Sequence, residues 1–157
     1  MQADSSNSFS FDQQYLFKQL IILDSSNKMI KGLTNYIFSN LESNKETIMN
    51  LLNSEVQKQP SNKLISILYL VHELIIRSIH ENKLDYIITF ETILPSLIHN
   101  IILNNEDINQ LIKVIELLQI WSKNLIFSNS YLNDYMLEAL KQKKKVSAIV
   151  LFILLGK

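Results

Sequence analysis

The sequence predicts an all-α protein, a superhelical bundle of about seven to eight helices. Apolar residues recur at helical spacing along the chain, and no segment alternates apolar and polar residues with the period of a strand. The 157 residues include only two Gly and two Pro, which disfavours sandwiches, barrels and glycine-rich phosphate loops. Apolar residues make up 47% of the chain, enough for one domain with a sizeable core.

Residues 63–78 are expected to form the central helix, because they include no Pro or Gly and are apolar around most of the circumference. One apolar stripe comprises Leu64, Ile67, Leu68, Val71, Leu74 and Ile75, and a second comprises Ile65, Tyr69, His72, Ile76 and Ile79. The polar face comprises Ser66, Glu73, Arg77 and His80. Other helices should cover such a helix on most sides. Its polar groups His72, Glu73 and Arg77 are therefore the first candidates for a site.

Caps and breakers bound the other helices. Residues 10–13 and 43–46 have the spacing of capping boxes, and each should open a helix. Pro60 breaks the chain before the central helix, whereas Pro95 falls in the first turn of a later one. Residues 104–107 read as a cap with acidic side chains. The expected helices are 10–23, 27–41, 43–57, 63–78, 84–91, 95–103, 108–123 and 130–141.

The chain divides into three parts. Residues 1–9 should be disordered, residues 10–142 should form the helical domain, and residues 143–157 are a basic and apolar tail. The lysines around the boundary between domain and tail are Lys141, Lys143, Lys144 and Lys145. Such a run is either a solvated helix end or a contact for nucleic acid or lipid.

The tail has three alternative interpretations. Residues 148–155 are all apolar, but at ~1.5 Å per residue they span only about 12 Å of a ~30 Å bilayer core. They form a last helix packed on the bundle, a segment that touches a membrane, or an artefact of the gene model. The artefact is considered because residues 145–147 are what a splice-donor consensus would encode in frame.

Composition and motifs argue against several functions. Fifteen Lys and Arg balance fifteen Asp and Glu, which disfavours a polyanionic partner such as duplex DNA. The chain has no Cys, and its three His lack metal-ligand spacing. Neither a Walker loop nor a Gly-x-Ser-x-Gly motif is present. We therefore expect no enzyme activity, no cofactor and no metal site. The polar amino terminus predicts neither a signal peptide nor a transit sequence.

Each candidate residue also has a structural interpretation. His72 is either a hydrogen-bonded core histidine or a ligand contact, and Tyr69 is either core or part of the same site. Glu73 and Arg77 are four residues apart and could form an ordinary helix-face pair worth ~0.3 kcal/mol. Trp121 ends an apolar stripe and is most simply a core residue.

The central helix resembles a known family. Residues 61–78 are similar to the signature Leu-Tyr-Leu-x-Asn-Asp-Val-x-x-x-Ser of the RNA polymerase II carboxy-terminal-domain interacting domain, the CID or RPR domain. Three further segments resemble the family in the same order along the chain. Residues 25–34 resemble its second helix, and Phe90 with Pro95 resembles its Phe-x-x-x-Phe-x-Pro region. Residues 113–121, followed by Ile126 and Phe127, resemble its Arg-Val-Leu-x-Ile-Trp and Val-Phe segments. The resemblance covers about residues 10–142, and the related ENTH and VHS domains share the superhelix.

The resemblance implies a right-handed superhelical bundle of the ENTH/VHS type. Family members bind heptad repeats, Tyr-Ser-Pro-Thr-Ser-Pro-Ser, as a β-turn between the second, central and Ile-Trp helices. The residue at position 72 hydrogen-bonds the peptide, and the second helix together with the surroundings of Tyr69 holds the heptad tyrosine. The implied peptide-binding residues are Asn27, Lys28, Met29, Ile30, Tyr69, His72, Glu73, Arg77, Lys113, Glu116, Ile120, Lys123 and Asn124.

The sequence departs from the family at the residues that contact the peptide. The Asn-Asp pair is replaced by His72 and Glu73. Many members carry an Arg five residues before the Trp or three after it, where it binds the phosphate of the first heptad serine. Here Glu116 and Asn124 occupy those positions. Lys113, Lys123 and Arg77 could supply charge, but not a guanidinium in the same place.

The leading hypothesis is a nuclear, non-catalytic adaptor. It would recognise the heptad-repeat tail of RNA polymerase II, phosphorylated or not, in transcription termination or mRNA 3′-end processing, with affinity roughly micromolar or weaker. No direct nucleic-acid or membrane partner is expected. The alternative is an ENTH/VHS-type membrane-trafficking adaptor, although residues 1–10 contain no basic residue for an anchor helix. A third possibility is a structural helical domain with another protein partner.

Overall fold

The computed structural model describes residues 10–124 and 126–156, and this part of the chain contains seven helices and no strand. The helices are α2 (Gln13–Ile22), α3 (Asn27–Lys58), α4 (Ser61–His80), α5 (Leu84–Glu91), α6 (Leu94–Ile102), α7 (Ile108–Lys123) and α8 (Asn129–Leu155). The all-α prediction is confirmed. The prediction for residues 1–9 lies outside the described residues.

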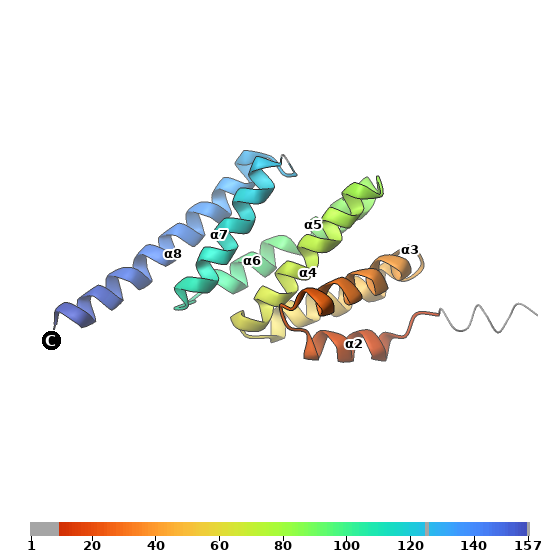
Figure 1. Ribbon diagram of the computed structural model, residues 1–157, viewed down its shortest axis with the longest axis horizontal. Helices are drawn as coiled ribbons and strands as arrows, with labels where there is room; N and C mark the ends of the chain where they lie inside the picture. The colour runs from red at the N-terminus through yellow and green to blue at the C-terminus, as the bar shows by residue number, and fades with distance from the viewer. Residues whose placement is uncertain (1–9, 125, 157) are drawn as a thin grey trace, which may run out of the picture.

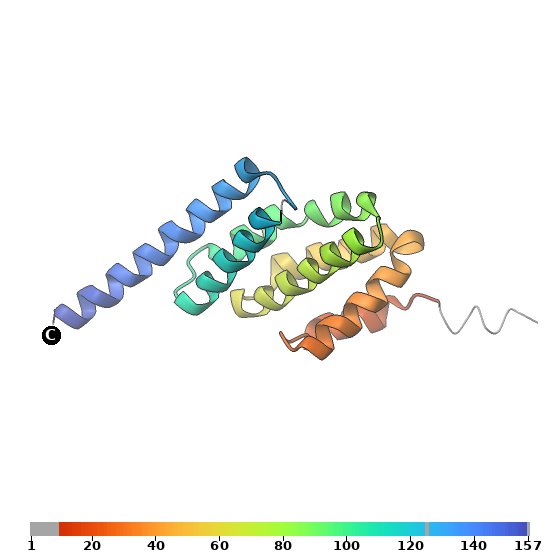
Figure 2. The same cartoon turned by 45° about the horizontal axis from the view of Figure 1, so that its top comes forward.

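Helix α4 lies at the centre of the bundle and packs against α3, α5, α6 and α7 (Figures 1 and 2). All six residues of its first apolar stripe are buried, as predicted. The second stripe differs, because Tyr69, His72 and Ile76 are only half-buried. Ser66, expected on the polar face, is buried and shares a 2.9 Å hydrogen bond with Ser25. The helix is therefore open along the Tyr69–Ile76 side rather than covered all round.

Helix α3 replaces two expected helices. It continues from Asn27 to Lys58 and is kinked at Asn44, whose φ of −132° and ψ of 27° are not helical. The side-chain amide of Asn44 donates to the carbonyl of Asn40 at 3.2 Å. The capping-box sequence at residues 43–46 therefore marks a kink, and the chain does not leave the helix there.

Two details at the start of the domain also differ from the prediction. Asp12 is the N-cap of α2, and its carboxylate accepts a hydrogen bond from the Tyr15 amide at 3.1 Å, so the helix begins after the expected residue 10. The apolar pattern of this segment also predicts that Tyr15 faces the core with Leu16 and Leu20, but Tyr15 is 45% exposed. Its ring packs edge-on against Tyr36 at 4.8 Å, because the face of α2 that carries it lies at the rim of α3.

The tail is the end of one long helix. Helix α8 packs along α7 and then continues past the rest of the bundle (Figures 1 and 2). Val146 is buried, but residues 149–155 are exposed, including Phe152 at 78%. The interpretation of a last helix packed on the bundle is therefore wrong for these residues. No helix in the described part of the chain is long and apolar enough to span a membrane.

Candidate functional site

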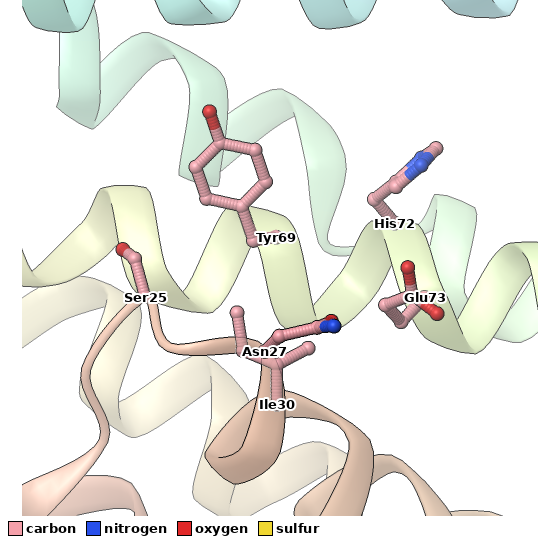
Figure 3. Close-up of a pocket in the computed structure, with 6 residues that line it drawn as sticks. All are labelled: Ser25, Asn27, Ile30, Tyr69, His72 and Glu73. Atoms are coloured by element: carbon pink, nitrogen blue, oxygen red, sulfur yellow. The ribbon is translucent and has the colours of Figure 1, made fainter.

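A pocket of about 150 Å³ lies at the seam between the start of α3 and the open side of α4. Its six lining residues are Ser25, Asn27, Ile30, Tyr69, His72 and Glu73 (Figure 3). In Figure 3, Tyr69 and His72 project from the same side of α4, while Asn27 and Ile30 come from the first turn of α3. Five of these residues were predicted. Ser25 was missed, although it is the first residue of the segment 25–34 that resembles the family's second helix.

The segment before α3 is fixed by polar contacts. Ser26 caps α3 by accepting from the Met29 amide at 3.3 Å, and the Asp24 carboxylate accepts from the Ser26 amide at 2.8 Å. Hydrogen bonds from the side chain and the backbone of Ser26 to the Asp24 carboxylate lower the pKa of Asp24. Lys63 of α4 donates to the carbonyls of Ile21 and Leu23 at the end of α2. Burial lowers the pKa of Lys63, and the charge of Asp24 opposes this shift. These bonds hold the α2–α3 connection, and with it Ser25, against α4.

His72 lines the pocket and also contacts the core. Its Nδ1 accepts a 2.9 Å hydrogen bond from Nε1 of Trp121, which is fully buried. An indole can only donate, so Nδ1 must be unprotonated. The neutral ring therefore carries its proton on Nε2. Burial lowers the pKa of His72, and Glu73 opposes the shift without reversing it. The core interpretation therefore applies to the Nδ1 edge of the ring, which contacts Trp121. The ligand interpretation applies to the other edge, where Nε2–H remains as a donor.

Tyr69 of α4 lines the pocket and senses a charge on α7. Burial raises the pKa of the Tyr69 hydroxyl, and the charge of Glu116 on α7 raises it further. The hydroxyl therefore remains protonated at neutral pH. Glu116 itself is exposed on α7 and does not line the pocket.

The other predicted residues of α7 are exposed. Lys113, Glu116, Ile120 and Lys123 lie on the solvent side of the helix, with Ile120 45% exposed. Asn124 is the C-cap residue, and its side-chain amide donates to the Ile120 carbonyl at 2.8 Å. None of these residues lines the pocket. Among the described lining residues, Glu73 carries the only formal charge.

Two predicted residues of α3 face another helix. Lys28 and Met29 line a different hollow, together with Tyr15 and Gln19 of α2. They lie on the flank of α3 that does not face His72, so the structure does not bring them into the pocket. The family segment 25–34 contains both flanks of one helix, and sequence similarity alone could not separate them.

Arg77 has different partners from the expected one. Its Nε donates to Glu81 at 2.6 Å and its Nη1 to the side-chain oxygen of Asn35 at 2.6 Å. The guanidinium also lies over the Phe38 ring, 4.9 Å from the centroid. The interpretation that Arg77 pairs with Glu73 is therefore wrong, because the guanidinium forms its ion pair with Glu81, one turn later.

One comparison with known proteins identifies a family for this chain. The sequence model of a family described as the CID domain matches residues 14–135, well over half of the chain. The matched range contains the start of α3, all of α4, all of α7 and the C-cap residue Asn124, and so includes every predicted binding residue. A search of curated proteins found no match. Within residues 10–124 and 126–156, no group of three or more His, Cys, Asp or Glu could hold a metal ion.

Proposed function

Because the chain belongs to the CID domain family, we propose that it is a peptide-binding adaptor for the heptad-repeat tail of RNA polymerase II. CID domains are protein-interaction modules, and no catalytic step is assigned to this chain. The proposal includes a nuclear location and a role in transcription termination or mRNA 3′-end processing. Its main support is the pocket at the α3–α4 seam, which is lined from two of the three helices that the family resemblance assigns to the heptad.

The pocket offers contacts that suit such a peptide. Nε2–H of His72 donates to a backbone carbonyl of the heptad turn, replacing the Asn or Asp of other members. The ring of Tyr69 and the side chain of Ile30 supply apolar surface for the heptad tyrosine. A disordered heptad loses conformational entropy when it is ordered, so the dissociation constant should be roughly micromolar or weaker.

A fluorescence titration tests the proposal. A labelled peptide of two unmodified repeats should bind saturably, whereas a scrambled peptide of the same composition should not. A third peptide with both heptad tyrosines replaced by alanine should bind at least about tenfold more weakly, equal to ~1.4 kcal/mol, because the ring fills the pocket. Equally weak fluorescence changes with all three peptides would refute the proposed function.

One observation favours the trafficking alternative. The end of α8 exposes the apolar residues 149–155 directly after a run of lysines, a pattern that suits an anionic membrane surface. Sedimentation with vesicles of phosphatidylserine and phosphatidylcholine, run beside the peptide titration, separates the two. Peptide binding without vesicle binding is the result expected of the adaptor.

A further inference from the structure

The α3–α4 seam continues into a second hollow beyond Glu73. Its volume is about 360 Å³, and it shares Glu73 with the first pocket. The lining residues are Lys31, Thr34 and Asn35 of α3 and Glu73, Ile76, Arg77 and His80 of α4. Along both helices these residues follow those of the first pocket by one to two turns. The two hollows therefore lie in sequence along one seam.

The second hollow carries basic groups that the first pocket lacks. Lys31, Arg77 and His80 line it, against the single carboxylate of Glu73. The ion pair with Glu81 and the bond to Asn35 use two of the five N–H donors of Arg77. The contact with Phe38 fixes the guanidinium plane. Arg77 is thus held in place with donors still available for an oxyanion.

Two further side chains have unused hydrogen-bonding capacity. Lys31 is exposed and makes no hydrogen bond or ion pair in the described part of the chain. Thr34 is 4% exposed, and its Oγ1 has no hydrogen-bond partner among the described residues. A buried hydroxyl without a partner is unusual in a folded protein, and Thr34 is one of the residues that line this hollow.

We propose that this hollow is an anion subsite, bound by a phosphate on the heptad peptide at a serine or threonine other than the first serine. This inference rests on the proposed function. Tyr69 and Arg77 are eight positions apart on one helix, about 12 Å along its axis. Outside the β-turn, an extended stretch of the peptide covers this distance in about four residues. A phosphate on that stretch reaches Arg77 and Lys31, and the acidic Glu116 of α7 does not line this hollow.

A panel of two-repeat peptides tests the subsite, each unmodified or carrying one phosphate at a defined position. At least one isomer other than the first-serine one should bind wild type about three- to tenfold more tightly than the unmodified peptide. Lys31→Gln should reduce that preference to less than about twofold. Lys18→Gln, the same charge change on an exposed position of α2, should keep it. The preference should weaken as salt rises, because Lys31 is exposed.

The outcomes separate the subsite from the proposed function. If unmodified peptide binds but no isomer binds more tightly, the subsite is wrong and the adaptor function stands. If no peptide binds, the adaptor function fails, and a titration with inorganic phosphate decides on the subsite. Saturable shifts of the NMR signals of Arg77 and His80, lost in Lys31→Gln, would retain it as an anion site, and unmoved signals would overturn it. Lys31 is solvent-exposed, so its variant should fold, which thermal melting verifies.

Discussion

The hydrogen bond between Trp121 and His72 predicts that position 72 contributes to stability as well as binding. In His72→Ala, the indole N–H of Trp121 loses its acceptor while the ring remains fully buried. A buried donor left without a partner costs about 1–3 kcal/mol. The free energy of unfolding should fall by at least this amount, and the melting temperature by roughly 2–4 °C per kcal/mol for a chain of this size.

A matched substitution separates the lost hydrogen bond from the lost ring. In His72→Asn, the side-chain oxygen sits on the same Cγ position that carries Nδ1 in histidine, so the acceptor for Trp121 is kept. His72→Asn should therefore recover most of the stability, to within about 1 kcal/mol of wild type. His72→Leu fills similar volume without an acceptor and should remain destabilised.

Urea denaturation followed by fluorescence measures these differences, and Trp121 is the only tryptophan in the chain. The account predicts the stability order wild type, then Asn, then Leu and Ala. If His72→Ala and His72→Leu unfold at the same urea concentration as wild type, the indole does not depend on His72. The tautomer argument for the pocket would then fail.

Four more predictions follow from the same structure. Folding lowers the pKa of His72, so the stability that the neutral ring contributes is present above the unfolded pKa near 6.5 and is lost as the pH falls below that value. Urea denaturation at pH 7.5 and 5.5 should show this loss of stability in wild type and a smaller loss in His72→Asn. Glu116→Arg should strengthen binding of the first-serine phosphopeptide alone by roughly 1–2 kcal/mol, and this gain should decrease as salt rises. A wild type that already prefers that phosphopeptide by about tenfold would contradict our interpretation of Glu116. Leu68→Ala should cost ~2–5 kcal/mol in urea denaturation, because Leu68 is 3% exposed, and wild-type-like unfolding would refute the central position of α4. Truncation after Ser147 should shift the melting temperature by less than about 2 °C and reduce self-association in sedimentation, since residues 149–155 contact solvent; a large loss of stability would show that they pack on the bundle.

Helical periodicity was sufficient to predict the core of the bundle. The first stripe of α4 is buried as expected, because a 3.6-residue period assigns one face of a helix to the core whatever its partners are. The second stripe looked equally apolar in the sequence. Its half-exposure depends on where α3 and α7 diverge, and no local pattern encodes that divergence. The pocket lies in the part that periodicity could not predict.

Contacts between distant segments explain the other differences. Glu73 and Glu81 both stand four residues from Arg77, so spacing alone could not choose between them. Asn35 and Phe38 of α3 hold the guanidinium on the side toward Glu81. The bond between His72 and Trp121 likewise joins residues 49 positions apart. Such pairs become visible only after the helices have been placed.

The apolar tail shows the limit of composition. Residues 149–155 predict burial by hydrophobicity, but after Val146 helix α8 extends past the helices against which it could pack. The family resemblance placed the end of the domain at about residue 142, and the last buried side chain is close to that position.

The most direct test of the adaptor function uses the indole N–H signal of Trp121 in a proton–nitrogen NMR spectrum. The chain has one tryptophan, and its Nε1–H is bonded to the histidine that lines the pocket. Addition of an unmodified two-repeat heptad peptide should shift this signal saturably, with the same dissociation constant as the fluorescence titration. Peptide binding that leaves the indole signal unmoved, with shifts collected on the far side around α5, would contradict the proposed site.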